Sequence, residues 1–588
     1  MRAGQFSLPF LFVVLAAGCG RIGYAHRASD AGLDGAVADA NRDAFALDVP
    51  LDSPRDAGRD TGERDAGGDA FVLVDECFVD NGGCDINASC TDEVVGRTCR
   101  CADHFAGDGL SCTVIPRSAL ALEAFVKSTN LGFSDYFGRA VAVSADGSTL
   151  AVGANYEDGG STLVNGLYNN DVGISGAVYV YRRVGGIWAF EAYIKASNTG
   201  ASDEFGVALA LSDDGSTLAV GARDEDGTGS GVGPVDDNGG TDCGAAYVYQ
   251  RTGSTWAFET SIKASNTGND DEFGNSLALS GDGNVLAIGA RLEDSSSSLV
   301  DGASNEDATD SGAVYVYRRS VVWSFEAFIK AVQTSPFDEF GNALALSQNG
   351  SVLAIGAHLE DSDGRGVGTV PNELATGSGG VYIYRHAAGW TLGEFIKATN
   401  TGREDEFGVS VALSSDGNVL AVGAQHEDGG RDGVGAAFDE GALESGAAYI
   451  YRFAGGSWRA EAFIKAPNSD RNDQFGLALS LSRDGSTLAV GAPFEDGGSL
   501  GVDGLFNEDA FDAGAVYIYR ALASSWGFDA YVKASNTGPE DYFGTSVALS
   551  ANGRFLAASS VNEDSDTAAI NGTPNEDSGN SGAVYLYR

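Results

Sequence analysis

The chain has 588 residues and a formal net charge of −47, from 83 acidic and 36 basic residues. Binding to a phosphate backbone requires clustered Lys and Arg, so this composition excludes nucleic acid as a partner and disfavours anionic membrane surfaces. Cations and basic partners are favoured instead, and the length is sufficient for several domains.

Residues 1–18 are predicted to be an export signal. The apolar stretch over residues 6–17 is too short to form a stable transmembrane helix. The run Leu15-Ala16-Ala17-Gly18-Cys19 resembles a bacterial lipoprotein cleavage site, which implies lipidation of Cys19 and, with Gly20 next to it, outer-membrane sorting. We therefore expect an exported chain, lipid-anchored to the bacterial outer membrane or cell surface. The alternative is an ordinary signal peptide with a chance cysteine.

Residues 19–75 are predicted to be a flexible tether. They are rich in Ala, Asp and Gly, poor in aromatic residues, and repeat the sequence RDAG at 55–58 and 64–67. Such a composition cannot bury enough apolar surface to offset the entropy lost on ordering. The segment would hold the folded part of the chain away from the membrane.

A group of six closely spaced cysteines follows the tether: Cys77, Cys84, Cys90, Cys99, Cys101 and Cys112. In an exported chain such a group predicts a disulfide framework, although spacing alone leaves the pairing open. The Cys-x-Cys pair and the run CADHFAGDGLSC at 101–112 resemble an EGF-like module, here over residues 76–113. That resemblance implies the disulfides Cys77–Cys90, Cys84–Cys99 and Cys101–Cys112.

The same resemblance extends to calcium. Asp75, Glu76 and Asp92 match positions of calcium-binding EGF-like modules, whereas Leu73 and Arg97 depart from the pattern. Calcium at this module is one prediction. The alternative is a purely structural scaffold, because a domain this small needs its disulfides in any case.

The rest of the chain is an internal repeat marked by a Phe-Gly pair. The pair recurs seven times at intervals of 67 or 68 residues, beginning at Phe137, Phe205, Phe273, Phe340, Phe407, Phe475 and Phe543. In the second unit, runs of β-branched and aromatic residues at 205–212, 217–222, 245–251 and 256–264 are bounded by Gly, Asp and Ser, and predict four antiparallel strands. A period this regular indicates one supersecondary unit copied seven times in an all-β fold.

The two ends of the repeat region predict how the units are arranged. The last unit stops after its third strand at Arg588, and residues 122–127 (LEAFVK) form an unpaired copy of the fourth strand. We therefore expect the N-terminal strand to complete the last blade of a closed seven-bladed β-propeller, because a solenoid would need distinctive capping repeats instead.

Two residue types recur once per unit near the fourth strand. The seven lysines (Lys127, Lys195, Lys263, Lys330, Lys397, Lys465 and Lys533) share one position, and six tryptophans and Leu120 each lie seven residues before a lysine. If the fourth strand is the outer edge of a blade, its Lys is expected to discourage edge-to-edge aggregation.

The recurring FG, GA and VY motifs resemble the FG-GAP repeats of integrin α-subunit propellers, over about residues 119–588. The resemblance implies a propeller used in adhesion. Integrin repeats carry an Asp-x-Asp-x-Asp-Gly calcium loop between their first two strands, where this chain has only a turn such as Ser144-Ala145-Asp146-Gly147. That calcium site therefore does not carry over, and the single Asp is expected to serve the turn.

Recurrent acids predict a functional face. Each unit has an Asp two residues before its Phe (Asp135, Asp203, Asp271, Asp338, Asp405, Asp473 and Asp541). Each also has a Glu-Asp pair after its second strand (Glu157-Asp158, Glu225-Asp226, Glu293-Asp294, Glu360-Asp361, Glu427-Asp428, Glu495-Asp496 and Glu563-Asp564). In an antiparallel blade these loops lie at one end. The acids are expected either to bind Ca²⁺ or to cap loops through backbone N–H groups; no organic cofactor is expected.

The sequence as a whole favours a monomeric surface binding protein that recognises an extracellular protein or glycan through this acidic face. The long second loops, over residues 227–241, 364–377 and 429–443, vary most and are expected to discriminate the ligand. No catalytic motif occurs, and His358 and His426 are expected to be chance neighbours rather than a shared site. A carboxylate-based hydrolase or lyase and a structural envelope component are the alternatives. The remaining cysteine, Cys243, is expected to be a neutral replacement of Ser, with an intermolecular disulfide as the alternative.

Overall fold

The computed structural model describes the backbone of four short strands between residues 88 and 114, and residues 120–588 except 235–236, 299, 436–437, 524, 569 and 576–578. The predicted signal, Cys19, the tether, Asp75, Glu76, Cys77 and Cys84 lie outside the described residues, as do the side chains of Asp92 and the other cysteines of the module. Among the described residues, none belongs to a helix long and apolar enough to cross a membrane.

The strands of the cysteine-rich segment form two small antiparallel pairs. β1 (Ala88–Asp92) pairs with β2 (Arg97–Cys101), and β3 (Phe105–Gly107) pairs with β4 (Cys112–Val114).

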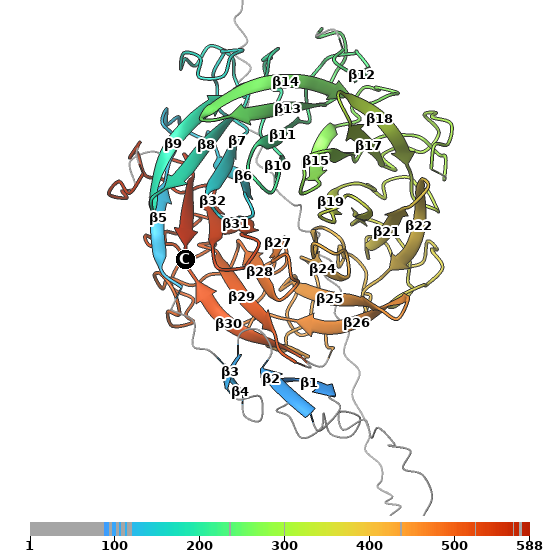
Figure 1. The fold of residues 1–588 in the computed structure, drawn as a ribbon, viewed down its shortest axis with the longest axis vertical. Coiled ribbons are helices and arrows are strands. Elements are labelled where there is room, and N and C mark those ends of the chain that lie inside the picture. Colours follow the sequence, from blue (N-terminus) through green and yellow to red (C-terminus); the bar gives the residue numbers. More distant parts are fainter. Residues whose placement is uncertain are drawn as a thin grey trace, which may run out of the picture. The chain divides into compact units, whose positions relative to one another are not determined.

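The repeats form seven antiparallel sheets arranged around one axis, each with the strand order 1-2-3-4 from the axis outwards (Figure 1). Blade 1 contains β6 (Phe137–Val143), β7 (Thr149–Ala154), β8 (Ala177–Val184) and β9 (Ile187–Ile194). Blade 2 contains β10 (Leu209–Leu211), β11 (Thr217–Ala222), β13 (Ala245–Thr252) and β14 (Thr255–Lys263), with the short β12 (Gly231–Val232) added beside β14. Blade 3 contains β15 (Phe273–Leu279), β16 (Val285–Ala290), β17 (Ala313–Arg319) and β18 (Trp323–Ile329).

The remaining blades follow the same plan. Blade 4 contains β19 (Ala343–Leu346), β20 (Val352–Ala357), β21 (Gly380–His386) and β22 (Trp390–Ile396). Blade 5 contains β23 (Val411–Leu413), β24 (Val419–Ala424), β25 (Ala447–Ala454) and β26 (Ser457–Ile464). Blade 6 contains β27 (Ala478–Leu481), β28 (Thr487–Ala492), β29 (Ala515–Ala521) and β30 (Trp526–Val532), and blade 7 begins with β31 (Phe543–Leu549), β32 (Leu556–Ser560) and β33 (Ala583–Tyr587).

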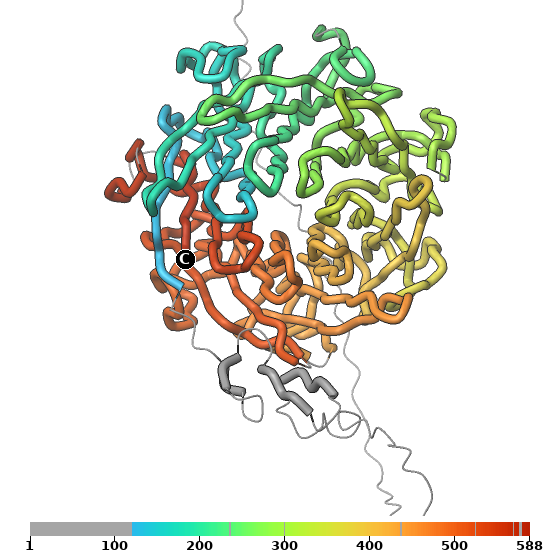
Figure 2. Tube along the Cα trace, in the orientation of Figure 1, coloured from blue at the N-terminus to red at the C-terminus, as the bar shows by residue number. Residues whose placement is uncertain are grey.

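The predicted closure of the ring is confirmed. β5 (Leu122–Val126) is the fourth strand of blade 7 and pairs with β33, so the blue N-terminal strand lies beside the red C-terminal one (Figure 2). Phe125 is buried and contacts the ring of Tyr585, with 5.2 Å between the centroids. Leu120, in the position of the missing tryptophan, is buried in the same apolar cluster.

The hydrophobic core lies between the blades. Each of seven clusters of buried side chains joins one blade to the next, and the last joins blade 7 to blade 1. No blade therefore has a complete core of its own, which is why a closed ring is required for stability.

The Phe-Gly pair holds neighbouring blades together. Gly206 has a φ of +98°, and a Cβ on Gly153 of blade 1 would lie 2.0 Å from the Gly206 carbonyl oxygen. Phe205 N–H donates to the Ser175 carbonyl of blade 1. β10 covers only Leu209–Leu211, so the expectation of a strand over 205–212 is wrong in its first half, whereas the first strands of blades 1, 3 and 7 begin at the Phe of Phe-Gly.

The opposite end of the propeller carries only short turns. In each turn the Asp or Asn before Gly is a cap: Asp146 Oδ1 accepts hydrogen bonds from Ser144 Oγ at 2.7 Å and Ser148 N at 2.9 Å. One backbone N–H per turn donates to the carbonyl of the next turn, in the order 145, 213, 281, 348, 415, 483, 551 and back to 145. Seven bonds of 2.7–3.0 Å thus close a ring, and Asp213 bonds across it to Gln348 and Arg483 from two other blades.

Candidate functional site

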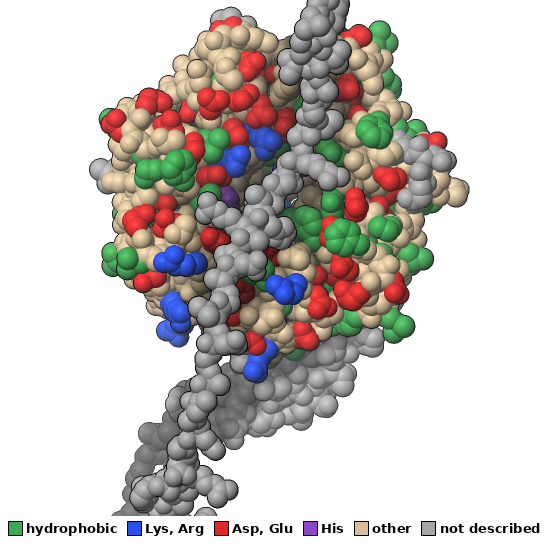
Figure 3. All heavy atoms as spheres, turned by 180° about the vertical axis from the view of Figure 1, so that it is seen from behind, with side chains coloured by type: hydrophobic (Ala, Val, Ile, Leu, Met, Phe, Trp, Pro, Cys, Tyr) green, Lys and Arg blue, Asp and Glu red, His purple; other side chains and the backbone are tan. Residues whose placement is uncertain are grey.

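The loops before each first strand and between the second and third strands lie at one end of the blades, which we name the loop face. Figure 3 shows this face, with acidic side chains spread over it and hydrophobic side chains among them. The recurrent acids predicted from the sequence lie at this end but beneath its surface. The aspartates before Phe-Gly are 2–4% exposed and the glutamates of the Glu-Asp pairs are 1–3% exposed.

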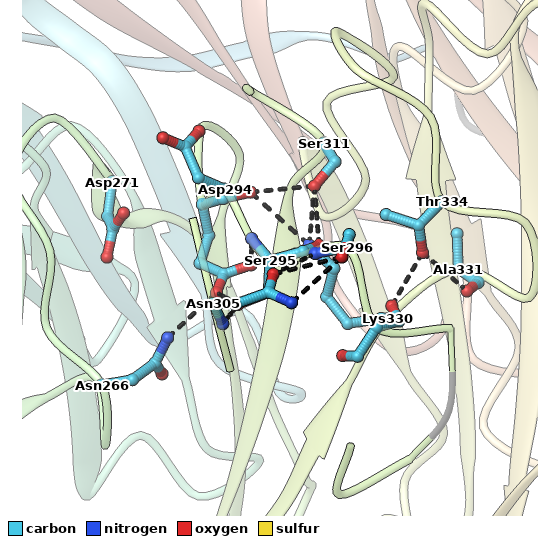
Figure 4. A network of polar contacts seen from close by, with 12 residues as sticks. Asn266, Asp271, Asp294, Ser295, Ser296, Asn305, Ser311, Lys330, Ala331 and Thr334 are labelled. Atoms are coloured by element: carbon cyan, nitrogen blue, oxygen red, sulfur yellow. Dashed lines mark hydrogen bonds and ion pairs between the residues drawn. The ribbon is translucent and has the colours of Figure 1, made fainter. Parts of the chain in front are cut away.

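Each buried glutamate is the centre of a hydrogen-bond network, shown for blade 3 in Figure 4. Lys330 Nζ donates to Glu293 Oε2 at 2.7 Å and to Ser311 Oγ at 2.8 Å. Asn266 Nδ2 donates to Glu293 Oε1 at 2.9 Å, and the Ser295 N–H donates to Oε2 at 3.1 Å. The carboxylate therefore ties the fourth strand, the second loop and the preceding interblade segment to one point.

The lysines do not guard an exposed edge, so that expectation is wrong. All seven are at most 2% exposed and each is paired with the glutamate of its own blade, at 2.6–2.8 Å in six blades. The second loop turns back over the outer strand, through β12 in blade 2 and through the bridges Val367–Ile396, Val434–Ile464 and Val502–Val532. The ammonium group is thereby covered, and a buried charge requires a partner.

An asparagine carries each network across to the next blade. In six interfaces Nδ2 donates to the glutamate at 2.7–3.1 Å, while Oδ1 accepts the hydroxyl of a buried tyrosine in the third strand (Asn130, Asn198, Asn266, Asn400, Asn468 and Asn536). Gln333 occupies the position between blades 3 and 4 and bonds Glu373 instead. The buried Tyr382 hydroxyl there has no hydrogen-bond partner.

The aspartates have the geometry of loop caps. Those before Phe-Gly accept the backbone N–H three residues earlier, as Asp271 does from Gly268 at 2.8 Å. Burial, with neighbouring carboxylates, raises the pKa of Asp135, Asp203, Asp271 and Asp405 to about 7 and of Asp338 and Asp473 to about 8. The second member of each Glu-Asp pair accepts the N–H sixteen residues later, at 2.6–3.1 Å.

This geometry bears on the calcium prediction. Both oxygens of every one of the seven glutamates are engaged, as Glu157 is by Lys195, Tyr193, Asn130 and Gly159. The glutamates therefore offer no free oxygen to a metal ion. No group of three or more His, Cys, Asp or Glu arranged for a metal occurs in the part of the chain with described side chains. Calcium binding stays a prediction, both for the recurrent acids of the loop face and for Asp75, Glu76 and Asp92.

Cys243 replaces the serine that receives the lysine ammonium group in five of the other six blades, while blade 6 has Ala513 there. Its thiol is buried, and Sγ lies 3.7 Å from Asn269 Oδ1. Lys263 keeps its ion pair with Glu225, so the blade 2 network retains its central contact.

A second group of polar residues, which the sequence analysis missed, surrounds the propeller axis at the loop face. Two positions per blade supply it: the residue before Phe-Gly (Tyr136, Glu204, Glu272, Glu339, Glu406, Gln474 and Tyr542) and the residue after the second strand (Asn155, Arg223, Arg291, His358, Gln425, Pro493 and Val561). We name these residues the axial cluster. The repeat pattern gave no signal for it, because these positions change from blade to blade.

Charged members of the axial cluster are joined across blades. Arg291 bonds Glu272 at 2.6 and 3.1 Å and Glu339 of the next blade at 2.8 Å. Arg223 Nη2 lies 2.9 Å from Glu204, whose carboxylate also accepts from Asn155 Nδ2 at 3.1 Å. This arc extends through blades 2 and 3 into blade 4.

The two histidines predicted to be chance neighbours, His358 and His426, both lie next to carboxylates of this charged arc. His358 Nε2 lies 3.8 Å from Glu339, and His426 Nδ1 lies 3.2 Å from Glu406. The Glu406 carboxylate acts on both rings. Burial lowers the pKa of His358, whereas the pKa of His426 is raised because the hydrogen bond and charge of Glu406, with the charges of Glu444 and Asp428, together outweigh burial. The expectation of a chance placement missed this shared neighbour.

Aromatic side chains occupy the other arc. Beside the axial cluster, Tyr136 packs on Tyr156 and Phe494 packs on Tyr542, with centroid distances of 5.0 and 5.1 Å. Figure 3 shows a histidine near the centre of this face, with basic, acidic and hydrophobic side chains around it.

Comparison with known proteins supports the family resemblance. The EGF domain family matches residues 77–112, and the FG-GAP repeat family matches residues 188–249, 256–317 and 458–519. A search of curated proteins gave no significant match.

Three solved structures are similar at low identity. The crystal structure of the mitotic checkpoint complex matches with a TM-score of 0.40 and 14% identity over 81% of this chain and 95% of that one. The crystal structure of the RRP9 WD40 repeats matches with a TM-score of 0.43 and 10% identity over 80% of this chain and 98% of that one. The Cps50 (Swd1) β-propeller domain of Myceliophteria thermophila matches with a TM-score of 0.39 and 9% identity over 76% of this chain and 95% of that one. From the family matches and the seven closed blades, the chain carries FG-GAP repeats on a seven-bladed β-propeller, together with an EGF-like domain.

Proposed function

We propose that the protein is a binding module that recognises an extracellular protein or glycan through the loop face, in an adhesion-type role at the cell surface. The observation that carries this proposal is the contrast between the two ends of the propeller. One end consists of short turns locked into a ring of backbone hydrogen bonds. The loop face instead carries long loops that differ between blades, and variable loops on a rigid scaffold are the usual place for recognition.

Exposed apolar side chains on these loops support a macromolecular partner. Leu167 is 85% exposed, Leu505 is 83% exposed and Phe511 is 62% exposed, and most of the large exposed apolar residues of the described chain lie on loops at this end. Apolar side chains surrounded by acids suit a protein partner with basic and apolar groups. The lipid anchor at Cys19 and the monomeric state belong to the same proposal.

The proposal is tested by solid-phase binding of the full chain to a panel of extracellular matrix proteins and glycans. We expect Leu505→Ser combined with Phe511→Ser to weaken binding of a panel ligand at least tenfold. Val321→Ser is the matched control, because Val321 is 90% exposed but lies in the turn between β17 and β18, at the other end. Equal effects of the loop and control variants, or no panel ligand at all, would contradict the proposal.

The same assay tests calcium. Repeating it in EDTA is expected to weaken binding if the EGF-like module supports the ligand, and Glu76→Gln is then expected to remove the calcium dependence. A surface hydrolase or lyase remains the alternative function, and turnover of a panel glycan would favour it.

A further inference from the structure

The axial cluster breaks the sevenfold repetition that governs the rest of the propeller. The network of Lys, Glu and Asn recurs in nearly every blade because it has a structural role. By contrast, Glu stands before Phe-Gly only in blades 2–5, and Tyr or Gln stands there in blades 6, 7 and 1. A structural role would favour the same residue in every blade, so this asymmetry points to a ligand that is itself asymmetric.

Four of the twelve buried side-chain atoms without a hydrogen-bond partner in the described residues lie in the axial cluster. Asn155 Oδ1, Arg223 Nε, His358 Nδ1 and Gln425 Oε1 are all buried without a hydrogen-bond partner, and all belong to the residue after the second strand. Arg223 Nε lies 3.4 Å from Asp224 but makes no hydrogen bond to it. Leaving a buried polar atom unpaired costs about 1–3 kcal/mol, so four at equivalent positions indicate groups that a ligand completes.

Arg139 adds an unused donor. It lies on β6 two residues after Phe137, its side chain is exposed, and no carboxylate lies within ion-pair distance of it among the residues with described side chains. Desolvation lowers the pKa of Arg139, and Arg223, Glu204 and Arg291 also act on it electrostatically, which places its guanidinium beside the charged arc.

The charge balance of the cluster favours an uncharged ligand. Glu204 and Asp224 share Arg223, Glu272 and Glu339 share Arg291, and Glu406 is bonded to His426. Neither a strongly anionic nor a strongly cationic group finds a matching excess of charge here. The open atoms are two amide acceptors, guanidinium donors and an imidazole nitrogen, and a hydroxyl group can both donate to the acceptors and accept from the donors.

The aromatic arc supplies the complementary surface. Tyr136, Tyr156, Phe494 and Tyr542 are each partly exposed beside the charged arc. Flat aromatic faces opposite a few fixed polar groups are the usual composition of a small-molecule site, and they suit the C–H faces of a sugar ring. The bonds of Asp213 to Gln348 and Arg483 cross the axis at the other end, so access is from the loop face.

We propose that the axial cluster binds an uncharged saccharide, whose hydroxyl groups pair with Asn155, Gln425 and Arg139 while a sugar ring packs against the aromatic arc. This inference rests on the proposed binding function of the loop face and names the ligand class for its centre. The peripheral loops would then contact the remainder of a longer glycan or the protein that carries it.

The test is calorimetric titration of the full chain with glucose, galactose and mannose and with short neutral oligomers of each. We expect saturable binding of at least one oligomer. Asn155→Leu and Tyr542→Leu are each expected to weaken it at least tenfold, and the control Val321→Ser is expected to leave it unchanged. Arg139→Met is the variant least able to disturb folding, because Arg139 is exposed and has no ion-pair partner; it is expected to weaken binding about tenfold, with an unchanged melting temperature.

Three outcomes would overturn the inference: no neutral saccharide binds, binding is indifferent to Asn155→Leu and Arg139→Met, or only charged glycans or basic peptides bind. If panel ligands still bind through Leu505 and Phe511 in that case, the saccharide inference fails and the proposed function stands. If neither saccharides nor panel ligands bind, the proposed function fails as well.

Discussion

The single interface that lacks the asparagine link gives the sharpest prediction about stability. Between blades 3 and 4, Gln333 points to Glu373 and leaves the buried Tyr382 hydroxyl unpartnered. In the next interface Asn400 bonds both Glu427 at 2.9 Å and Tyr449 at 2.7 Å. We expect Gln333→Asn to restore the corresponding bonds to Glu360 and Tyr382.

The expected gain follows from the two bonds restored. Each is worth about 0.5–1.5 kcal/mol net, and the exposed Gln333–Glu373 bond that is lost offsets about 0.5 kcal/mol, which leaves a gain of about 0.5–2.5 kcal/mol. At about 2.1 cal/mol/K per residue, the unfolding entropy of residues 120–588 is about 1 kcal/mol/K, so the melting temperature should rise by about 0.5–2.5 °C in differential scanning calorimetry.

Matched tyrosine variants separate this explanation from others. Tyr449→Phe removes a paired hydroxyl and should cost about 1 kcal/mol, whereas Tyr382→Phe removes an unpaired one and should be neutral or stabilising. In the Gln333→Asn background, Tyr382→Phe should acquire a cost. Equal costs for the two tyrosine variants in the natural background, or a lower melting temperature for Gln333→Asn, would refute the reasoning.

Three further predictions concern ring closure, the buried ion pairs and pH. Phe125→Ala should lower the free energy of unfolding in urea by about 3–4 kcal/mol, because it opens a cavity where β5 closes the ring. The control Leu122→Ala, at an exposed position of the same strand, should lower it by under about 1 kcal/mol. Similar losses for the two variants would contradict the role of β5 in closing the ring. Lys465→Met should lower the free energy of unfolding by about 3–5 kcal/mol, because it leaves the buried Glu427 carboxylate without its cation. Adding Glu427→Gln should recover much of that loss. A loss below about 1 kcal/mol for Lys465→Met would contradict the role of the ion pair. Burial raises the pKa of Asp203 to about 7, above its ordinary value of 3.8, so the stability that the protonated Asp203 contributes is complete below pH 4 and is lost as the pH rises through about 7. Melting temperatures measured from about pH 5 to 8 should therefore fall less in Asp203→Asn than in the natural chain. Parallel curves for the two proteins would disprove this prediction.

The repeat made the fold readable from the sequence. Because the Phe-Gly unit occurs seven times, strand boundaries that are ambiguous in one copy could be read from the others. The predicted strands at 217–222, 245–251 and 256–264 agree with β11, β13 and β14 to within one residue. The closure by residues 122–127 followed from counting strands. The first strand of blade 2 was misjudged at Phe205, because equivalent Phe-Gly sequences begin a strand in blades 1, 3 and 7 but not in blade 2.

The site was harder to predict, for opposite reasons in its two parts. Lysines at a strand edge are usually exposed, and only the folded second loop shows that Lys330 is buried against Glu293. The axial cluster has no repeat signal, since Glu272, His358 and Tyr542 occupy corresponding regions of different blades and differ in chemistry. Their proximity depends on the circular arrangement, which no local pattern in the sequence encodes.

The ring of backbone hydrogen bonds at the turn end also constrains how this gene can change. Each of its seven bonds sets the spacing of two adjacent turns, so the perimeter of the ring is proportional to the number of blades. Loss or duplication of one repeat would alter that perimeter and move Asp213 relative to Gln348 and Arg483, which it now bonds across the axis. A change in the number of repeats would therefore disrupt this ring of bonds, whereas the loops at the other end take no part in it.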